Sequence, residues 1–360
     1  MKHSTGILTF INTLNYGAEL QAYALTHLVS LLGYDAELVN YNCSSVSKRE
    51  TPRLPGFGDL SNPKRFVGQL MKYPELKERA KGFEKFTKNY IPVGTKVKNA
   101  SDILNLYDRV IVGSDQVWCP QITGCDMTYV LDGKHREGQR IISYAASFGD
   151  KIFPKKCVDY FSTALLRFDA LSVREERGLE ILASLGITDA VVSIDPTLLL
   201  VKSEWEKLFK HPTNLSHKYV LAYVVSERDQ TIQYAKQAAI KLGVDLLYID
   251  AYSGRPVPGA RNVGDVAPDA FLSLIHDAEL VVTSSFHGLC FSVLFNKEFR
   301  YSLSTKKQNS RLYNLALQLG VEHYDIENTN LSDRIDYVET NRRMGQYRDE
   351  SIDYLKKALA

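Results

Sequence analysis

The fold is decided by residues 5–41, which read TGILTFINTLNYGAELQAYALTHLVSLLGYDAELVNY. Residues 5–11 form a short apolar run of strand length, and from Ala18 the apolar residues recur at helical spacing up to Gly33. Residues 36–41 then have the pattern of a second strand. A strand, a helix and a strand in so short a space form a parallel crossover, which predicts a parallel sheet covered by helices.

The same alternation continues over most of the chain. In the first half, the sequence predicts helices at 155–168 and 175–185 and strands at 109–112, 140–146, 170–173 and 190–194. The pattern loosens around 200–217. A second series then predicts helices at 229–242, 268–277 and from about 288, and strands at 218–225, 245–249, 280–284 and 298–303. The fold class is therefore α/β, with two doubly wound domains that face a cleft.

The loosening of the pattern sets the expected domain boundary. We expect an N-terminal domain at 1–205 and a C-terminal domain at 206–330, followed by a helical segment at 331–360 that packs back on the first domain. Residues 42–100 are rich in Lys, Arg, Pro and Gly, with one helix predicted near 75–89. We interpret them as an insertion or lid of the first domain.

Composition excludes several classes of protein. The 44 Lys and Arg residues nearly balance the 42 Asp and Glu residues, and the resulting net charge of +2 is not typical of a protein that binds nucleic acid. No apolar run reaches the length of about 18 residues that a membrane span requires, and the apolar run at the N-terminus is too short for a signal peptide. A cytoplasmic protein is expected.

The chain has five cysteines, at positions 43, 119, 125, 157 and 290. Their number is odd, and no pair has the spacing C-x-x-C, which argues against both a disulfide framework and a zinc site. The sequence predicts reduced, structural thiols.

The loop after the first strand contains Asn15, Tyr16 and Gly17. Because it leads into a helix, its backbone N–H groups could bind an anion at the helix N-terminus. The alternative is that Asn15 caps the helix and Gly17 forms a turn.

A second polar loop, Ser114, Asp115 and Gln116, follows the strand at 109–112. Asp115 and Gln116 could accept hydrogen bonds from a sugar, and Asp115 could move a proton. The alternative is a capped turn over a buried Trp118.

Arg174 stands where the strand at 170–173 ends and a helix begins. A cation at this positive end of a helix is unfavourable unless it meets an anion, which makes Arg174 a candidate ligand for an anionic substrate. A salt bridge to Glu175, Glu176 or another acid is the alternative.

The segment Ser284-Ser-Phe-His-Gly288 lies between an apolar strand and a helix. Ser284, Ser285 and His287 would be at the mouth of the strand, and Gly288 allows close backbone approach. An anion there would raise the pKa of His287 and favour its charged form, whereas the alternative is a structural histidine.

Three cations, Lys306, Lys307 and Arg311, follow the strand at 298–303. The two lysines are expected to be solvated charges. Arg311 is better placed for a ligand, on a helix that Asn309 and Ser310 could cap.

These segments occur in an order that resembles the polysaccharide pyruvyl transferase family. The resemblance spans residues 5–320 in outline and rests on six motifs: NYGAELQAYA from Asn15, GSDQVW from Gly113, SYAASFG from Ser143, SVREE from Ser172, DPTL from Asp195 and SFHG from Ser285. It implies a GT-B-like fold of two Rossmann-like domains. It also implies transfer of the pyruvyl group of phosphoenolpyruvate to a sugar of a surface polysaccharide or its precursor, giving a cyclic ketal and phosphate.

The resemblance further implies that Arg174 and His287 contact phosphoenolpyruvate, which is a co-substrate, with no other cofactor and no metal. Many members have an arginine where this chain has Ser285, so either Arg311 or a lysine replaces it or the donor differs. Our hypothesis makes Arg174 the donor clamp, His287 the phosphate ligand or acid, and Asp115 the base on the acceptor side. A lipid-linked acceptor would bring the protein transiently to the inner face of the membrane.

Two other functions fit the same pattern. The first is a GT-B glycosyltransferase that uses a nucleotide sugar. The second is a non-catalytic member of the family that binds a saccharide or a phosphorylated metabolite as a regulator.

Overall fold

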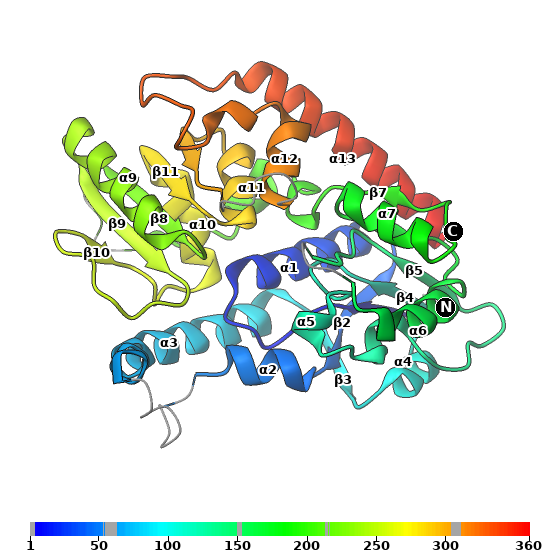
Figure 1. The fold of residues 1–360 in the computed structure, drawn as a ribbon. Helices are drawn as coiled ribbons and strands as arrows, with labels where there is room; N and C mark the ends of the chain where they lie inside the picture. Colours follow the sequence, from blue (N-terminus) through cyan, green and yellow to red (C-terminus); the bar gives the residue numbers. More distant parts are fainter. Residues whose placement is uncertain are drawn as a thin grey trace.

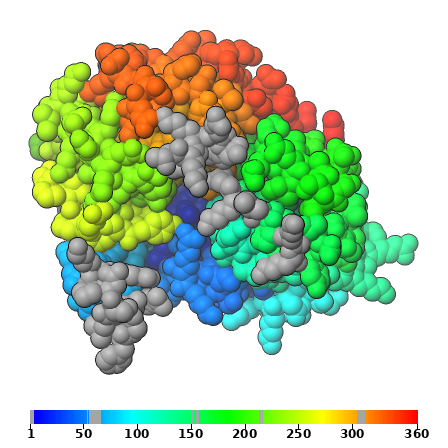
Figure 2. Space-filling model, in the orientation of Figure 1, coloured from blue at the N-terminus to red at the C-terminus, as the bar shows by residue number. Residues whose placement is uncertain are grey.

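The computed structural model describes residues 4–52, 54, 63–149, 153–212, 215, 217–303 and 311–360. Two α/β halves lie side by side, and the last helix runs from the second half back to the first (Figure 1). The blue N-terminal segments are visible between the two halves in the space-filling view (Figure 2).

The first sheet has five parallel strands in the order β3-β2-β1-β4-β5. Their bounds are β1 Ser4–Leu8, β2 Asp35–Tyr41, β3 Val93–Val97, β4 Arg109–Val112 and β5 Arg140–Ser143. Bridges from Ile142 to Ala170 and from Ala146 to Val173 continue this sheet into a small parallel pair, β6 Ser172–Val173 and β7 Val191–Val192. Ile7 and Leu8 of the central β1 are fully buried, as expected of a sheet covered on both faces.

The second sheet repeats this arrangement with the order β10-β9-β8-β11-β12, again all parallel. Its strands are β8 Tyr219–Val224, β9 Asp245–Asp250, β10 Arg261–Asn262, β11 Leu280–Thr283 and β12 Phe299–Tyr301. In each sheet the first strand of the series lies at the centre, and the strand order reverses beside it. The predicted fold class of two doubly wound, Rossmann-like domains is therefore confirmed.

Helices connect the strands in both halves. In the first half they are α1 Tyr16–Leu31, α2 Ser44–Glu50, α3 Pro63–Tyr90, α4 Ala100–Leu106, α5 Pro120–Thr123, α6 Lys155–Leu165, α7 Glu176–Ser184 and α8 Lys202–Glu206. In the second they are α9 Arg228–Leu242, α10 Pro268–Asp277, α11 Phe286–Leu294, α12 Arg311–Leu319 and α13 Tyr337–Leu359. Short 3-10 turns lie at η2 Met127–Val130, η3 Pro196–Leu198 and η5 Glu322–Tyr324.

Helix α1 lies at the junction of the two halves, and its residues from Tyr16 to Thr26 are all buried. One hydrophobic core includes Leu20 and Tyr23 of α1 together with Phe271 of α10 and Phe291 of α11. The two domains therefore share a core through α1, although each also has a core of its own on the far face of its sheet.

The stretch predicted as an insertion or lid supplies part of the first sheet. Residues 93–97 form β3, the edge strand, and the helix expected near 75–89 is the C-terminal part of the longer α3. Helix α3 also reaches the second domain, where Arg79 donates to the carbonyl of Gly264 and Lys72 to that of Asp250.

Helix α13 returns to the first domain. Arg109 and Arg140 donate to the carbonyls of Leu359 and Ala358 at 3.0 and 2.9 Å, and Tyr354 donates to that of Ser143 at 2.8 Å. These contacts attach the end of the chain to strands β4 and β5. Among the described residues, no helix combines the length and apolar character needed to cross a membrane.

The prediction of five reduced cysteines is wrong for one pair. Cys125 and Cys157 form a disulfide between Cα atoms 6.9 Å apart, while Cys43, Cys119 and Cys290 are buried. Residues 125 and 157 are 32 positions apart, and only the packing of α6 against η2 brings them together. Cysteine spacing along the chain could not show this tertiary contact.

Candidate functional site

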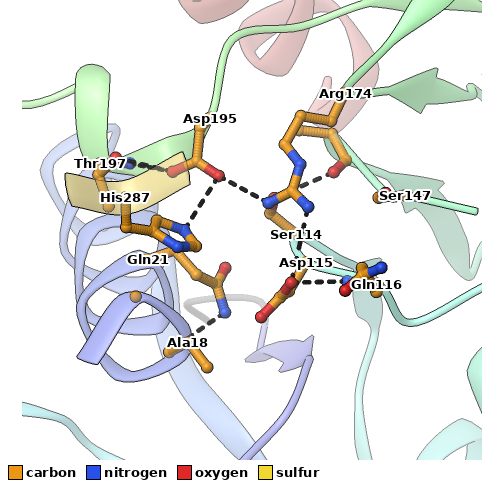
Figure 3. A network of polar contacts seen from close by, with 12 residues as sticks. Ala18, Gln21, Ser114, Asp115, Gln116, Ser147, Arg174, Asp195, Thr197 and His287 are labelled. Carbon is orange, nitrogen blue, oxygen red and sulfur yellow. Dashed lines mark hydrogen bonds and ion pairs between the residues drawn. The ribbon is translucent and has the colours of Figure 1, made fainter. Parts of the chain in front are cut away.

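Polar side chains from both domains converge where the strands of the two sheets end. Asp115 follows β4, Arg174 follows β6, Asp195 comes just after β7, and His287 lies in the first turn of α11, directly after β11. Figure 3 shows these four side chains pointing toward one another. The carboxyl ends of the strands thus carry the site, as expected for doubly wound sheets.

Arg174 is the centre of this cluster and is only 5% exposed. Its Nη1 donates to Oδ2 of Asp195 at 3.0 Å, whereas Nη2 lies 3.6 Å from Oδ1 of Asp115 and Nε lies 3.9 Å from Oε2 of Glu175. Burial alone would lower the pKa of Arg174, but the three carboxylates raise it above its usual value. Among the described residues, Nε and Nη2 have no hydrogen-bond acceptor, so two of its donor nitrogens are available to a ligand.

The ring of Phe286 covers the guanidinium of Arg174, whose Cζ is 4.7 Å from the ring centroid. Because Arg174 stands at the start of a helix, it was expected to meet an anion. The protein itself supplies that anion, in the carboxylate of Asp195 and those of its neighbours. This is the salt-bridge alternative, with Asp195 rather than Glu176 as the main partner.

Asp195 is the functional candidate that sequence reasoning missed. Its Oδ1 accepts hydrogen bonds from the backbone N and Oγ1 of Thr197 at 3.0 and 2.8 Å, while Oδ2 faces both Arg174 and His287. Burial works to raise the pKa of Asp195, yet the adjacent His287 and Arg174 hold it below the usual range. The sequence showed it only as the first residue of the DPTL motif, and in the structure it also caps the short turn η3.

His287 joins the two domains. Its Nε2 lies 3.6 Å from Oδ2 of Asp195 and has no hydrogen-bond partner among the described residues. The ring also packs on the first turn of α1, because a Cβ atom at Gly17 would overlap Nδ1 of His287. Gly17 is thus needed for close approach of the two domains. The sequence had suggested only that it forms a turn.

In the loop after β4, Asp115 belongs to the cluster, whereas Ser114 and Gln116 hold the loop in place. Asp115 has the unusual φ of 72° and accepts a hydrogen bond from the backbone of Gln116 at 2.8 Å. Ser114 is fully buried and donates to the carbonyl of Ala145 at 3.0 Å. Gln116 lies against Gly149, where an added Cβ would be 2.7 Å from its Nε2. Only Asp115 faces Arg174.

Gln21 on α1 is a second side chain that the sequence did not single out. It is fully buried and lies beside the cluster in Figure 3. Its Nε2 donates to Thr9 Oγ1 and to the carbonyl of Ala18, both at 2.9 Å, while Oε1 has no partner among the described residues. The available signal was a Gln on a helix whose other residues from Leu20 to Leu25 are Leu, Ala and Tyr.

In the loop before α1, Asn15 caps the helix, which was the alternative to anion binding by this loop. Asn15 Oδ1 accepts hydrogen bonds from the backbone N of Gly17 and Ala18 at 3.0 and 3.4 Å, so these groups are already occupied. Tyr16 donates to the carbonyl of Val266 at 2.8 Å, and its ring stacks on Phe271 at 4.3 Å. Both residues therefore connect or cap elements at the domain junction.

The segment around His287 is held by short-range hydrogen bonds. Ser284 Oγ accepts from the backbone N of Val225 and Ser226 at 3.0 and 3.1 Å, and Ser285 Oγ caps α11 by accepting from Gly288 N at 3.3 Å. An added Cβ at Gly288 would overlap Thr283 Oγ1. Ser284, Ser285 and Gly288 therefore position His287.

Arg311, at the start of α12, lines a small space together with Arg174, Asp195 and Phe286. This space measures about 10 Å³, room for no more than one water molecule. Lys306 and Lys307, with Asn309 and Ser310, lie outside the described residues.

A larger cleft of about 710 Å³ opens between the domains next to this cluster. Asn15 and Tyr16 line it from the first domain, together with α2 and α3, and residues 251–255 line it from the second. Lys48, Arg49 and Arg255 are exposed cations of its wall. Arg174 and His287 do not line the cleft, so the predicted site residues occupy two adjoining places. Within the described parts of the chain, no group of three or more His, Cys, Asp or Glu residues could hold a metal ion.

Comparison with known proteins gives a family and a fold. The model of the polysaccharide pyruvyl transferase family matches residues 15–305. No curated protein sequence matches the chain.

Two solved structures show the same architecture at low identity. One is a proposed UDP-N-acetylglucosamine 2-epimerase from Listeria monocytogenes, with TM-score 0.51, 11% identity, and 98% of this chain and 90% of that chain covered. The other is a glycosyltransferase from Rickettsia africae ESF-5, with TM-score 0.50, 11% identity, and 99% of each chain covered. At this identity the likeness shows the fold alone, and it confirms the GT-B-like prediction.

Proposed function

This chain belongs to the polysaccharide pyruvyl transferase family, and from that premise we propose that it transfers the pyruvyl group of phosphoenolpyruvate to a saccharide. The acceptor is a sugar of a surface polysaccharide or its precursor. Two of its hydroxyls become the oxygens of a ketal, and inorganic phosphate is released. The acceptor can be lipid-linked, in which case the protein acts at the inner face of the membrane.

The observation that carries this proposal is the shared use of Asp195 by Arg174 and His287. One oxygen of Asp195 faces both Arg174 and His287, one from each domain, yet Arg174 Nε and Nη2 and His287 Nε2 have no hydrogen-bond partner among the described residues. A carboxylate or phosphate oxygen of the donor would supply these missing acceptors, and charge-assisted hydrogen bonds of this kind each contribute roughly 1.5–3 kcal/mol.

The reaction divides into addition and elimination. An acid protonates the methylene carbon of the enol, the oxygen of a sugar hydroxyl bonds to the adjacent carbon, and a base takes the hydroxyl proton. The bond from that carbon to the phosphate oxygen then breaks, phosphate leaves with the bonding pair, and the neighbouring hydroxyl attacks to close the ketal as it loses its proton. We assign the acid or phosphate-binding role to His287 because its Nε2 lies 3.6 Å from Oδ2 of Asp195 and has no hydrogen-bond partner among the described residues. Arg174 clamps the donor, and Asp115 is the base.

The proposal needs no metal and no further cofactor, because Arg174 and Arg311 supply positive charge to the donor and His287 supplies a ring nitrogen for hydrogen bonding. It does need space. Beside Arg174 only about 10 Å³ is open, so we propose that α12 moves away from Arg174 when the donor binds.

The test is the thermal stability of the purified protein with and without phosphoenolpyruvate, in parallel with the His287→Ala variant. A ligand at 100 times its dissociation constant stabilises the native state by about 2.7 kcal/mol. We expect an upward shift of Tm that disappears in the variant. Stabilisation by UDP or GDP with no response to phosphoenolpyruvate would instead select a glycosyltransferase that uses a nucleotide sugar.

A further inference from the structure

A second cavity of about 430 Å³ lies in the first domain, beside the interdomain cleft. Its walls come from the loop after β1, from the end of α2 and from the C-terminal half of α3. Leu14, Glu50 and Thr51 line both cavities, so the two adjoin along these residues. A ligand bound in the cleft can therefore continue into the second cavity.

The charge of the second cavity is opposite to that of the cleft. Glu19, Glu50 and Glu84 line it against a single cation, Lys88, among the described residues. Glu19 is 4% exposed and accepts a hydrogen bond from Thr87 Oγ1. A carboxylate has about four sites that can accept a hydrogen bond, so Glu19 retains the capacity to accept further donors.

An independent observation points to a missing partner in the same cavity. Thr13 lines the wall, is 4% exposed, and its Oγ1 has no hydrogen-bond partner within the described part of the chain. A buried hydroxyl without a partner is costly, which is why such groups are usually paired. Thr13 and Glu19 together offer a donor and several acceptors to a ligand rich in hydroxyl groups.

We propose that this cavity is a second saccharide subsite, which binds a neutral sugar residue adjacent to the one that is modified. The inference rests on the proposed function and makes the acceptor at least a disaccharide. Glu19 and Glu50 accept hydrogen bonds from sugar hydroxyls, and the hydroxyl of Thr13 pairs with another. Because carboxylates predominate in the wall, an anionic sugar such as a uronic acid is rejected by like-charge repulsion.

The subsite is tested by binding to a printed array of defined neutral and uronic-acid-containing mono- and oligosaccharides. We compare the wild type with Thr13→Val and Glu19→Gln, after a check of folding by circular dichroism. The matched control is Glu137→Gln, because Glu137 is exposed in the loop before β5. We expect retention of neutral oligosaccharides over monosaccharides and over their uronic-acid counterparts. Thr13→Val should weaken retention about tenfold, and Glu137→Gln should not change it.

The Glu19→Gln variant separates charge from shape, because the amide keeps the volume of the side chain. At pH 8, where Glu19 is mostly ionised because burial raises its pKa only to about 7, the substitution should reduce the discrimination between neutral and uronic-acid oligosaccharides. Unchanged retention and discrimination in both Thr13→Val and Glu19→Gln would overturn the subsite, as would a wild type that retains no neutral oligosaccharide.

Stabilisation of the wild type by phosphoenolpyruvate is measured in the same preparations. A response to phosphoenolpyruvate without glycan binding overturns the subsite and leaves the proposed function standing. Glycan binding that depends on Thr13, without any response to phosphoenolpyruvate, supports the subsite and counts against the donor.

Discussion

The imidazole ring of His287 in the second domain lies directly on Gly17 in the first. A side chain at position 17 would occupy the space of the imidazole ring, because even a Cβ atom there would overlap Nδ1 of His287. Two elements far apart in the sequence, the first turn of α1 and the first turn of α11, are therefore matched to each other at the domain junction.

The first prediction follows from this contact. Gly17→Ala should destabilise the protein by about 1–3 kcal/mol, because the added methyl group must displace His287 or separate the domains. It should also abolish the stabilisation by phosphoenolpyruvate. Urea unfolding with and without the ligand measures both effects.

The matched control is Gly345→Ala, which adds the same methyl group in α13. Apart from the backbone of its own helix, no atom of the described residues lies within 4 Å of a Cβ placed at Gly345, and alanine is the better helix former, so the change should be neutral or stabilising by up to about 1 kcal/mol. A Gly17→Ala protein as stable as the wild type would show that the domains are not held together at this point.

The second prediction concerns Asp195. Because its pKa is held below the usual range in the folded state, its ionisation stabilises the protein above the ordinary Asp pKa of about 3.9. This contribution is lost as the pH falls below that value. Asp195→Asn should cost about 3 kcal/mol at pH 7, because Arg174 loses its hydrogen-bonded carboxylate, and should make the loss of stability in acid less steep. Unfolding free energies between pH 7 and pH 3 check this, and parallel curves for the two proteins would contradict it.

The third prediction concerns Glu19, whose contribution to the pH dependence of stability has the opposite sign to that of Asp195. Burial raises its pKa to about 7, whereas the unfolded chain has a value near 4.5. Stability is therefore greatest when Glu19 is protonated, and the wild type should lose up to about 3 kcal/mol as the pH rises from about 4.5 to about 7.

Glu19→Gln keeps the shape of the side chain but does not titrate. Its unfolding free energy should lack the part of the pH dependence that Glu19 contributes. The difference between the two proteins, followed from pH 4 to pH 8, isolates this group from the others that titrate in the same range. A difference that stays constant with pH would show that Glu19 has an ordinary pKa.

Much of the fold was visible in the sequence because the signals are local. The apolar run at β1, the helical spacing of α1 and the closing Gly33 are determined by residues close in the chain, and the second series repeats the same pattern. The edge strand β3 was hidden because residues 93–97 show no run or alternation of apolar side chains and three of the five are exposed, as an edge strand can be. The disulfide between Cys125 and Cys157 depends on a tertiary contact that spacing does not encode.

The candidate site was predictable in its types of residue but not in its pairing. The place of Arg174 at the start of a helix correctly indicated that it must meet an anion, yet the main partner, Asp195, is 21 residues away. In the sequence, Asp195 stood out only as the first residue of the DPTL motif, which assigned it no role. The contact between His287 and Gly17 depends on how two domains meet, and neither local segment specifies it.

The fourth prediction concerns the way in which α3 joins the domains. Glu75 lies between Lys72 and Arg79, which are 4% and 2% exposed, and also accepts a hydrogen bond from Asn262 of the second domain at 2.8 Å. Glu75→Ala would leave two buried cations without their carboxylate, so we expect a loss of about 3–5 kcal/mol. Glu78→Ala on the same helix is the control, because its pair with Lys81 is exposed and should contribute less than about 1 kcal/mol. Hydrogen exchange should also become faster at residues 261–266 in Glu75→Ala but not in Glu78→Ala, since α3 contacts the second domain there. Equal effects of the two substitutions would mean that α3 is not a structural link between the domains.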